Sequence, residues 1–208
     1  MKKSLIWCLL LAIVSIMATG CSSCQSENKK QEIAYHDYDG IVQDFTAGVS
    51  HIQALHRQTM FSLIGGKDFQ WRNSRVMLND TVKMENIDDL HIVSVNDVFF
   101  YWDSEKGPMV QYINSHVKNG VQIPFPINDV WIEDADMSKK PIKISAEDAL
   151  KRLKEWNGVL PQGCSFLTLR YPVGPKECNV QWVFGDVQDA LFIDAVTGEV
   201  RDYDPAFK

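Results

Sequence analysis

Short apolar segments alternate with turn-forming residues throughout the last third of the chain. The segments "SFLTLRY", "NVQWVF", "ALFID" and "EVRDY" each have the length of a strand, and Gly, Pro and Asp separate them. Segments this short are too brief for stable helices, whereas Gly and Pro between them are typical of tight connections. We therefore expect an antiparallel β-meander in this part of the chain.

A helix is expected directly before this meander. Ser145 can cap its first turn, and Asp148 three residues later gives a pair that resembles a capping box. Gly158 stands where a C-terminal cap is expected. The apolar face of this helix would comprise Ala149, Leu150, Leu153 and Trp156.

The stretch "FIDAVTGEV", residues 192–200, closes the meander. A strand ends at Asp194, whose carboxylate can accept hydrogen bonds from the backbone of the turn that follows. Gly198 can supply the positive φ that such a turn needs, and Val200 belongs to the last strand. These residue types predict a hairpin turn and not a catalytic loop.

A longer helix is expected in the first half, between Gly40 and Ile64, because apolar residues recur there at three- and four-residue steps. Asp39 can cap its start, and the pair at 65–66 ("GG") can end it. The face that would pack on a sheet comprises Ile41, Phe45, Val49, Ile52, Met60 and Leu63, with His56 between them.

Strand patterns follow this helix. The apolar parity changes between Trp71 and Val76, which predicts a bulge or turn at residues 73–74. The segment "HIVSVNDVFFYWD" predicts two strands joined at residues 96–97, and "DSEKGP" predicts a turn before "MVQYIN". The run 98–102 is apolar on both faces, which favours a central strand covered on both sides over an exposed aromatic binding surface.

Residues 116–143 mix prolines, glycine and charges, which is typical of a connecting segment. Glu133, Asp134 and Asp136 form a small acidic cluster within it. A calcium loop needs oxygen ligands at alternate positions and a turn glycine, and the cluster lacks that pattern. We therefore expect a solvated acidic loop, with no metal and no cofactor.

These patterns place the protein in the α+β class, as a helix followed by an antiparallel β-meander, with two such helix-plus-sheet subdomains. The first would span residues 37–115 and the second residues 144–208, joined by the segment 116–143. The first half could be a diverged copy of the second, although no residue-level repeat supports this interpretation.

The first twenty residues resemble the signal peptide of a bacterial lipoprotein. Lys2 and Lys3 precede an apolar run over residues 5–17 that is too short for a comfortable membrane span. The sequence "ATGC" at residues 18–21 resembles the lipobox of this class. The resemblance implies cleavage before Cys21, acylation of Cys21 as a lipid anchor, and a flexible tether over residues 21–36.

Cleavage would remove Lys2 and Lys3 and change the formal net charge from −6 to −8. An acidic surface argues against nucleic acid as a partner. Ser22 stands where Asp would resemble the inner-membrane retention signal, so we expect the outer membrane, with the leaflet left open. Because acylated Cys21 has no thiolate, its C-x-x-C spacing to Cys24 does not predict a redox or zinc site.

The pattern "ISAEDALKRLKEW…VQWVFGDVQDALFIDAVTGEV" resembles the PepSY domain over about residues 141–203. Ala146 and Ala149 stand near the family's helix start, and residues 194–200 fit its "vDa-tGev" ending. PepSY domains are small non-catalytic modules of secreted and envelope proteins, and those in metallopeptidase propeptides are thought to regulate peptidases. The resemblance implies protein binding, with a peptidase as a candidate partner, and it carries no catalytic residues.

Motifs of catalysis are missing from the sequence, which contains no G-x-S-x-G, no H-E-x-x-H and no phosphate-binding glycine loop. The five histidines are interpreted as surface or satisfied structural residues, and His51 and His56 on the first helix would point in different directions. No catalytic residue is assigned.

Two covalent modifications other than acylation are suggested by the residues. An oxidising compartment favours a disulfide between Cys164 and Cys178, whereas strand parity would place the two sulfurs on opposite sides of the sheet. The sequence therefore does not decide whether the two cysteines are bridged. The triplet Asp80-Thr81-Val82 resembles the short O-glycosylation site of exported Bacteroidetes proteins, which makes Thr81 a candidate acceptor.

The expected function is that of an envelope-anchored, non-catalytic binding lipoprotein that binds or regulates a protein partner such as a peptidase. The expected surface is the open face of the sheet or an exposed edge strand. One alternative is a structural or assembly accessory of the outer membrane. A second is a hydrolase whose site assembles across the two halves, which would need a deep pocket with converging polar side chains.

Overall fold

The computed structural model describes residues 35–36, 45–79, 90–161, 163–186 and 189–208. The predicted lipidation site Cys21, the predicted helix cap Asp39 and the predicted glycosylation site Thr81 lie outside this part of the chain. The elements in chain order are β1 (Tyr35–His36), the 3-10 turn η1 (Phe45–Ala47), α2 (Val49–Leu63), β2 (Gln70–Leu78), β3 (Ile92–Asp103), β4 (Gly107–His116), β5 (Gly120–Pro124), α3 (Ala146–Lys154), β6 (Phe166–Arg170), β7 (Gln181–Phe184), β8 (Leu191–Asp194) and β9 (Val200–Arg201).

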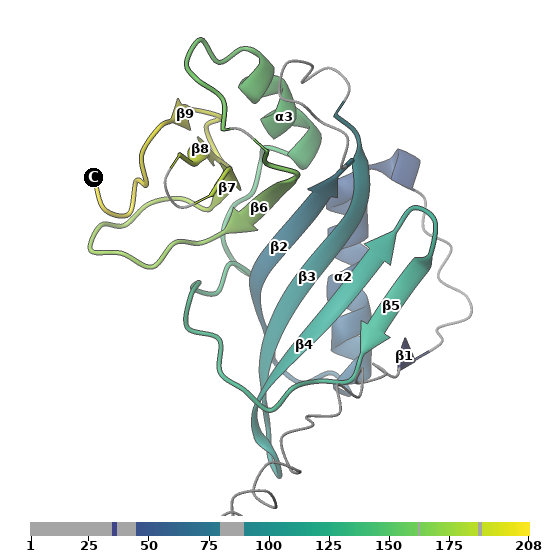
Figure 1. Ribbon diagram of the computed structural model, residues 1–208. Helices are drawn as coiled ribbons and strands as arrows, with labels where there is room; N and C mark the ends of the chain where they lie inside the picture. Colours follow the sequence, from purple (N-terminus) through teal and green to yellow (C-terminus); the bar gives the residue numbers. More distant parts are fainter. Residues whose placement is uncertain (1–34, 37–44, 80–89, 162, 187–188) are drawn as a thin grey trace, which may run out of the picture. The chain divides into compact units, whose positions relative to one another are not determined.

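The described strands form one antiparallel sheet in the order β1-β5-β4-β3-β2-β6-β7-β8-β9. The predicted α+β class, with helices followed by strand meanders, is confirmed. Helix α2 lies along one face of β2, β3 and β4, and α3 lies near the C-terminal strands (Figure 1).

The same element order occurs twice. Helix α2 precedes the meander β2 to β5, and α3 precedes the meander β6 to β9. The two meanders are joined through their first strands, because β2 pairs with β6 in antiparallel orientation. Apart from β1, which pairs with the outer edge of β5, the strand order is symmetric about the β2–β6 pair, with four strands on each side. The interpretation of the two halves as copies of one unit stays a prediction.

Helix α2 begins at Val49, later than the predicted start at Gly40. Gly48 has a φ of 87°, which a right-handed helix cannot contain, and the Val49 N–H is capped from α3 by the Glu147 carboxylate at 2.9 Å. The predicted end is confirmed, since Gly65 and Gly66 have positive φ angles. No helix of the described chain is long and apolar enough to cross a membrane.

Strands β2 and β3 correct one prediction and confirm another. The register of β2 shifts between Trp71 and Asn73, so the predicted bulge exists one residue earlier than expected. The predicted break in β3 at residues 96–97 is wrong, because β3 continues unbroken from Ile92 to Asp103. The polar pair in the middle of β3 is paired on both sides instead of forming a turn.

Helix α3 begins as predicted and ends earlier. Ser145 is its N-cap and accepts a hydrogen bond from the Asp148 N–H at 3.1 Å. Its buried face contains Ala149, Leu150 and Leu153, as expected. Glu155 is the C-cap, so the expected cap at Gly158 is wrong. The backbone has already left the helix three residues before that glycine.

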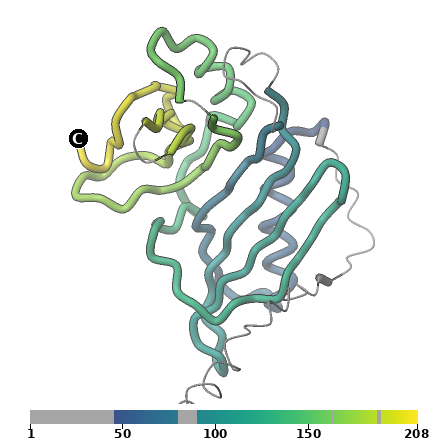
Figure 2. The backbone as a smooth tube through the Cα atoms, viewed as in Figure 1, coloured from purple at the N-terminus to yellow at the C-terminus, as the bar shows by residue number. Residues whose placement is uncertain are grey.

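Residues 125–138, which we call the strap, connect β5 to the second half (Figure 2). The strap begins along β4, where Ile127 and Val110 exchange two backbone hydrogen bonds of 2.8 Å. It ends beside β2, where the Met137 N–H donates to the Trp71 carbonyl at 2.9 Å. The strap therefore crosses from one edge of the first meander to the junction with the second.

Candidate functional site

Helix α2 places His56 against the sheet, where it contacts two polar side chains. His56 Nδ1 lies 2.6 Å from Asp97 Oδ2, and His56 Nε2 contacts the Ser115 hydroxyl. Trp71 Nε1 donates to the second oxygen of Asp97 at 3.0 Å. If Nδ1 donates to Asp97, a neutral ring accepts the Ser115 proton at Nε2, which is the connectivity of a Ser–His–Asp triad.

This network, however, is inaccessible. The exposed fractions are 1% for His56 and 0% for Asp97 and Ser115. A catalytic serine needs space for an approaching carbonyl group, and neither depression described below is lined by any of the three residues. The prediction of satisfied structural histidines is confirmed for His56, while His51 faces solvent. In this conformation the network can orient α2 on the sheet but cannot receive a substrate.

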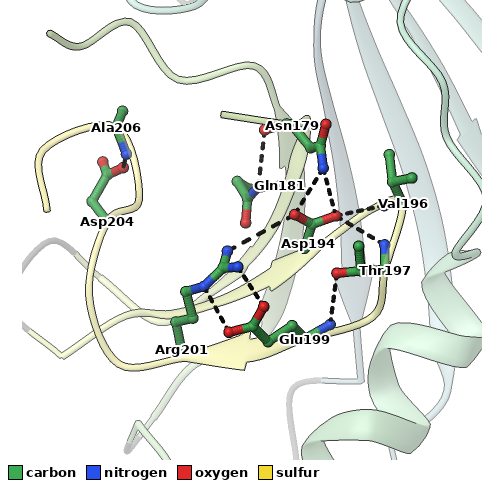
Figure 3. Close-up of polar contacts among 9 residues, drawn as sticks. All are labelled: Asn179, Gln181, Asp194, Val196, Thr197, Glu199, Arg201, Asp204 and Ala206. Carbon is green, nitrogen blue, oxygen red and sulfur yellow. Dashed lines mark hydrogen bonds and ion pairs between the residues drawn. The ribbon is translucent and has the colours of Figure 1, made fainter. Parts of the chain in front are cut away.

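The turn after β8 is organised by the Asp194 carboxylate (Figure 3). Its Oδ1 accepts hydrogen bonds from the Val196 and Thr197 N–H groups at 2.9 Å each. Asn179 Nδ2 donates to both carboxylate oxygens, at 3.2 and 3.0 Å. Gly198 has a φ of 78° and donates its N–H to the Asp194 carbonyl at 2.8 Å. The predicted turn roles of Asp194 and Gly198 are confirmed.

The protonation of Asp194 fits this structural role. Burial is the largest single influence on its pKa and acts to raise it. Hydrogen bonds from Thr197, Asn179 and Val196 oppose burial and together hold the pKa of Asp194 below its ordinary value. The fold therefore stabilises the ionised carboxylate, which suits a turn anchor and not a general acid.

A polar depression of about 560 Å³ lies beside this turn. Its lining includes the cations Lys140, Arg201 and Lys208 and the carboxylates Glu177 and Asp194. Arg201 is already engaged, with Nη1 3.8 Å from Asp194 Oδ2 and Nη2 paired with Glu199. Both signs of charge therefore line the depression, so its lining does not indicate one class of charged ligand.

Cys164 and Cys178 are free thiols. Cys164 Sγ accepts the N–H of Gly185, directly after β7, whereas Cys178 precedes Gln181, the first residue of β7. The strand advances four residues from Gln181 to Gly185, which is about 13 Å. The Cα atoms of a disulfide are only about 4.4–6.8 Å apart. Because the two cysteines lie at opposite ends of β7, the structure does not pair them. Burial raises the pKa of both thiols.

The acidic cluster of the strap is solvated only in part, because Glu133 is exposed as the sequence predicts whereas Asp134 is buried. Asp134 is buried, with Oδ1 2.7 Å from Arg170 Nε in an ion pair that lacks the angle of a straight hydrogen bond. Asn73 Nδ2 donates to its other oxygen at 3.0 Å. Asn73 and Arg170 are cross-strand partners in β2 and β6, so Asp134 binds to both strands at the junction of the two meanders. No group of three acidic, His or Cys side chains in the described residues could hold a metal ion.

Between its two anchored ends, the strap forms a groove of about 180 Å³ with β4, which we call the strap groove. Its lining from β4 is Val110 and Tyr112. The strap contributes Ile127, Asp129, Val130, Trp131, Ile132 and Glu133. Six of the eight lining residues are aliphatic or aromatic, and the charged groups among the eight are two carboxylates.

Exposed apolar side chains surround the strap groove. Phe125, Ile127, Val130 and Ile132 are 50% to 80% exposed, and Trp102 at the end of β3 is 67% exposed. Within the run 98–102, Val98 and Phe99 are buried as predicted, the next two residues are half-buried and Trp102 is exposed. Four of the five exposed side chains belong to the strap, and the fifth, Trp102, belongs to the adjoining hairpin.

Sequence reasoning missed both the buried triad and the strap groove. The network draws on three separate elements, so no local spacing reveals it. The strap groove had a usable signal, because "IPFPINDVWIE" concentrates large apolar residues in a segment expected to be a connection, where exposure of several such residues is unusual. No family model matches the chain, and no curated protein or solved structure is detectably similar to it.

Proposed function

We propose that this chain is an envelope-anchored, non-catalytic binding lipoprotein of the outer membrane whose partner is another protein. The observation that supports the proposal best is the exposed apolar surface of the strap around Val130 and Ile132. Exposed apolar side chains grouped around a concave surface are characteristic of protein interaction sites. The strap holds these side chains in place through backbone hydrogen bonds at both ends, so little ordering is needed on binding.

Two further observations support the non-catalytic part of the proposal and the class of partner. The only Ser–His–Asp arrangement found among the described residues is buried beneath α2. The resemblance of residues 141–203 to PepSY domains favours a peptidase as the protein that is bound or regulated.

The test is crosslinking and pull-down from outer membranes, with the full acylated chain as bait. Ile132→Asp introduces a charge at a side chain that is 80% exposed, so the fold should be kept. Val159→Asp, at an equally exposed residue after α3, is the matched control. We expect one partner to be recovered by the wild type and the control and to be lost with Ile132→Asp.

The identity of the captured protein separates the remaining alternatives. A peptidase whose activity changes when the chain is added supports regulation of proteolysis. Assembly or transport components without a peptidase support the accessory role. Hydrolysis of test esters or peptides by the pure chain, abolished by Ser115→Ala, would contradict the non-catalytic proposal.

A further inference from the structure

The strap groove has the size of one side chain. An aliphatic cavity of about 150 Å³ can accommodate benzene, and the strap groove offers about 180 Å³. Val110 is buried on the floor and Ile132 stands exposed at the rim, so an inserted side chain would contact aliphatic atoms at both depths. A Leu, Met or Phe side chain fits this description.

The groove is also rigidly supported. Ile127 is held by two backbone hydrogen bonds to Val110, and Asn128 Nδ2 donates to the Pro108 carbonyl at 3.2 Å. At the other end Trp131 Nε1 donates to the buried Asp134 at 3.3 Å. A preformed groove lowers the entropic cost of binding an extended segment.

The charge of the groove is one-sided. Asp129 and Glu133 line it, and no Lys, Arg or His does. Burial raises the pKa of the Tyr112 phenol, which also lines the groove, and the charges of both carboxylates raise it further. The full chain is acidic as well, with a formal net charge of −6. Anionic lipid head groups and acidic peptides would be repelled, whereas a cation next to the inserted side chain would be attracted.

We infer that the strap groove binds a large apolar side chain of a partner protein, in a segment that places Lys or Arg directly beside it. This inference rests on the proposed protein-binding function and names the chemistry of its partner. The cation pairs with Asp129 or Glu133 at the rim, where it adds specificity and rate more than affinity. The apolar side chain supplies the affinity.

The test uses three short synthetic peptides and the full chain in detergent. Each peptide carries one photoreactive diazirine analogue of leucine, which has the size of the side chains that the groove fits, flanked by two Arg, two Gln or two Glu residues. We expect the Arg peptide to label the strap and β4 at least five times more strongly than the Glu peptide at low salt, with the Gln peptide between them. High salt should bring the three yields together.

Variants connect this labelling to the groove. In Asp129→Asn/Glu133→Gln the preference for the Arg peptide should disappear while the melting temperature stays unchanged. Glu155→Gln, an exposed carboxylate at the end of α3, is the control and should label like the wild type. Equal labelling by the Arg and Glu peptides, or labelling away from the strap, would overturn the inference. Crosslinking of the groove to a second copy of the chain or to phospholipid vesicles would also overturn it.

The two proposals fail in different ways. If membranes yield a protein partner that is captured equally well by the wild type, by Ile132→Asp and by Asp129→Asn/Glu133→Gln, the binding function stands and the groove inference is wrong. If the Arg peptide labels the groove but membranes yield no protein partner, the groove chemistry stands and the proposed function is wrong.

Discussion

Replacing Asp97 by Ala should destabilise the protein strongly, because two buried donors lose their acceptor. His56 Nδ1 and Trp71 Nε1 donate to its two oxygens, at 2.6 and 3.0 Å. A buried donor left without a partner costs about 1–3 kcal/mol, so the free energy of unfolding should fall by about 3–5 kcal/mol. With a urea m-value of about 2 kcal/mol/M, the unfolding midpoint should shift down by about 2 M.

Ser115→Ala should cost less, about 1–2 kcal/mol, because it removes one neutral hydroxyl contact of His56. Urea unfolding followed by tryptophan fluorescence and circular dichroism measures both variants, with the exposed Glu155→Gln as control. In the double variant the two losses should not add, since both side chains act through the same imidazole ring. Asp97→Ala within about 0.5 kcal/mol of the wild type, the spread of ordinary surface substitutions, would refute the structural role of the network.

Three further predictions concern the second half. Asp194→Asn should make stability depend less on pH in the acid range than it does in the wild type. Folding lowers the pKa of Asp194, so its contribution is present above the ordinary Asp pKa of about 3.9 and is lost as pH falls below that value. Acid unfolding curves of the two proteins measure the difference. Gly198→Ala should destabilise the protein by about 1–2 kcal/mol, because the residue has a φ of 78° and an added Cβ would lie 3.2 Å from Arg152 Nε. Gly107→Ala is the control, because Gly107 also has a positive φ but an added Cβ would meet no atom within 4 Å. Thermal melts should show the larger loss for Gly198→Ala. Both Cys164 and Cys178 should be alkylated in unreduced, denatured protein, and in the native state buried Cys164 should react more slowly; mass spectrometry that finds neither labelled would reveal a disulfide.

The C-terminal half was predictable because its signals are local. The Ser145 cap, the apolar spacing of α3 and the Asp194 turn each depend on residues within a few positions of one another, and all three are present in the structure. The start of α2 was not predictable from apolar spacing, because the helical spacing of apolar residues continues before Gly48, whereas the positive φ of Gly48 ends the helical backbone there.

Buried polar residues account for the larger errors. Asp97 suggests a turn in the sequence, but its partners His56 and Trp71 lie 41 and 26 positions away and satisfy it inside a strand. Asp134 suggests a solvated loop, but it is buried against Arg170 and Asn73, which are distant from it in the sequence. A carboxylate is expected at the surface unless a partner is known, and these partners are visible only in three dimensions.

The strap groove and the resemblance of residues 141–203 to PepSY domains support the proposed binding function independently, because they involve different residues. The resemblance covers residues 141–203, whereas the groove is built from β4 and the strap, which ends at residue 138. The groove nevertheless needs both halves, since Asp134 anchors the strap to Asn73 of the first meander and Arg170 of the second. Buried apolar side chains of both halves also belong to one core, and Glu147 of α3 caps α2. A partner whose capture by the whole chain is lost with Ile132→Asp would therefore use the strap groove, whereas a partner whose capture is kept would use another surface, such as that of residues 141–203.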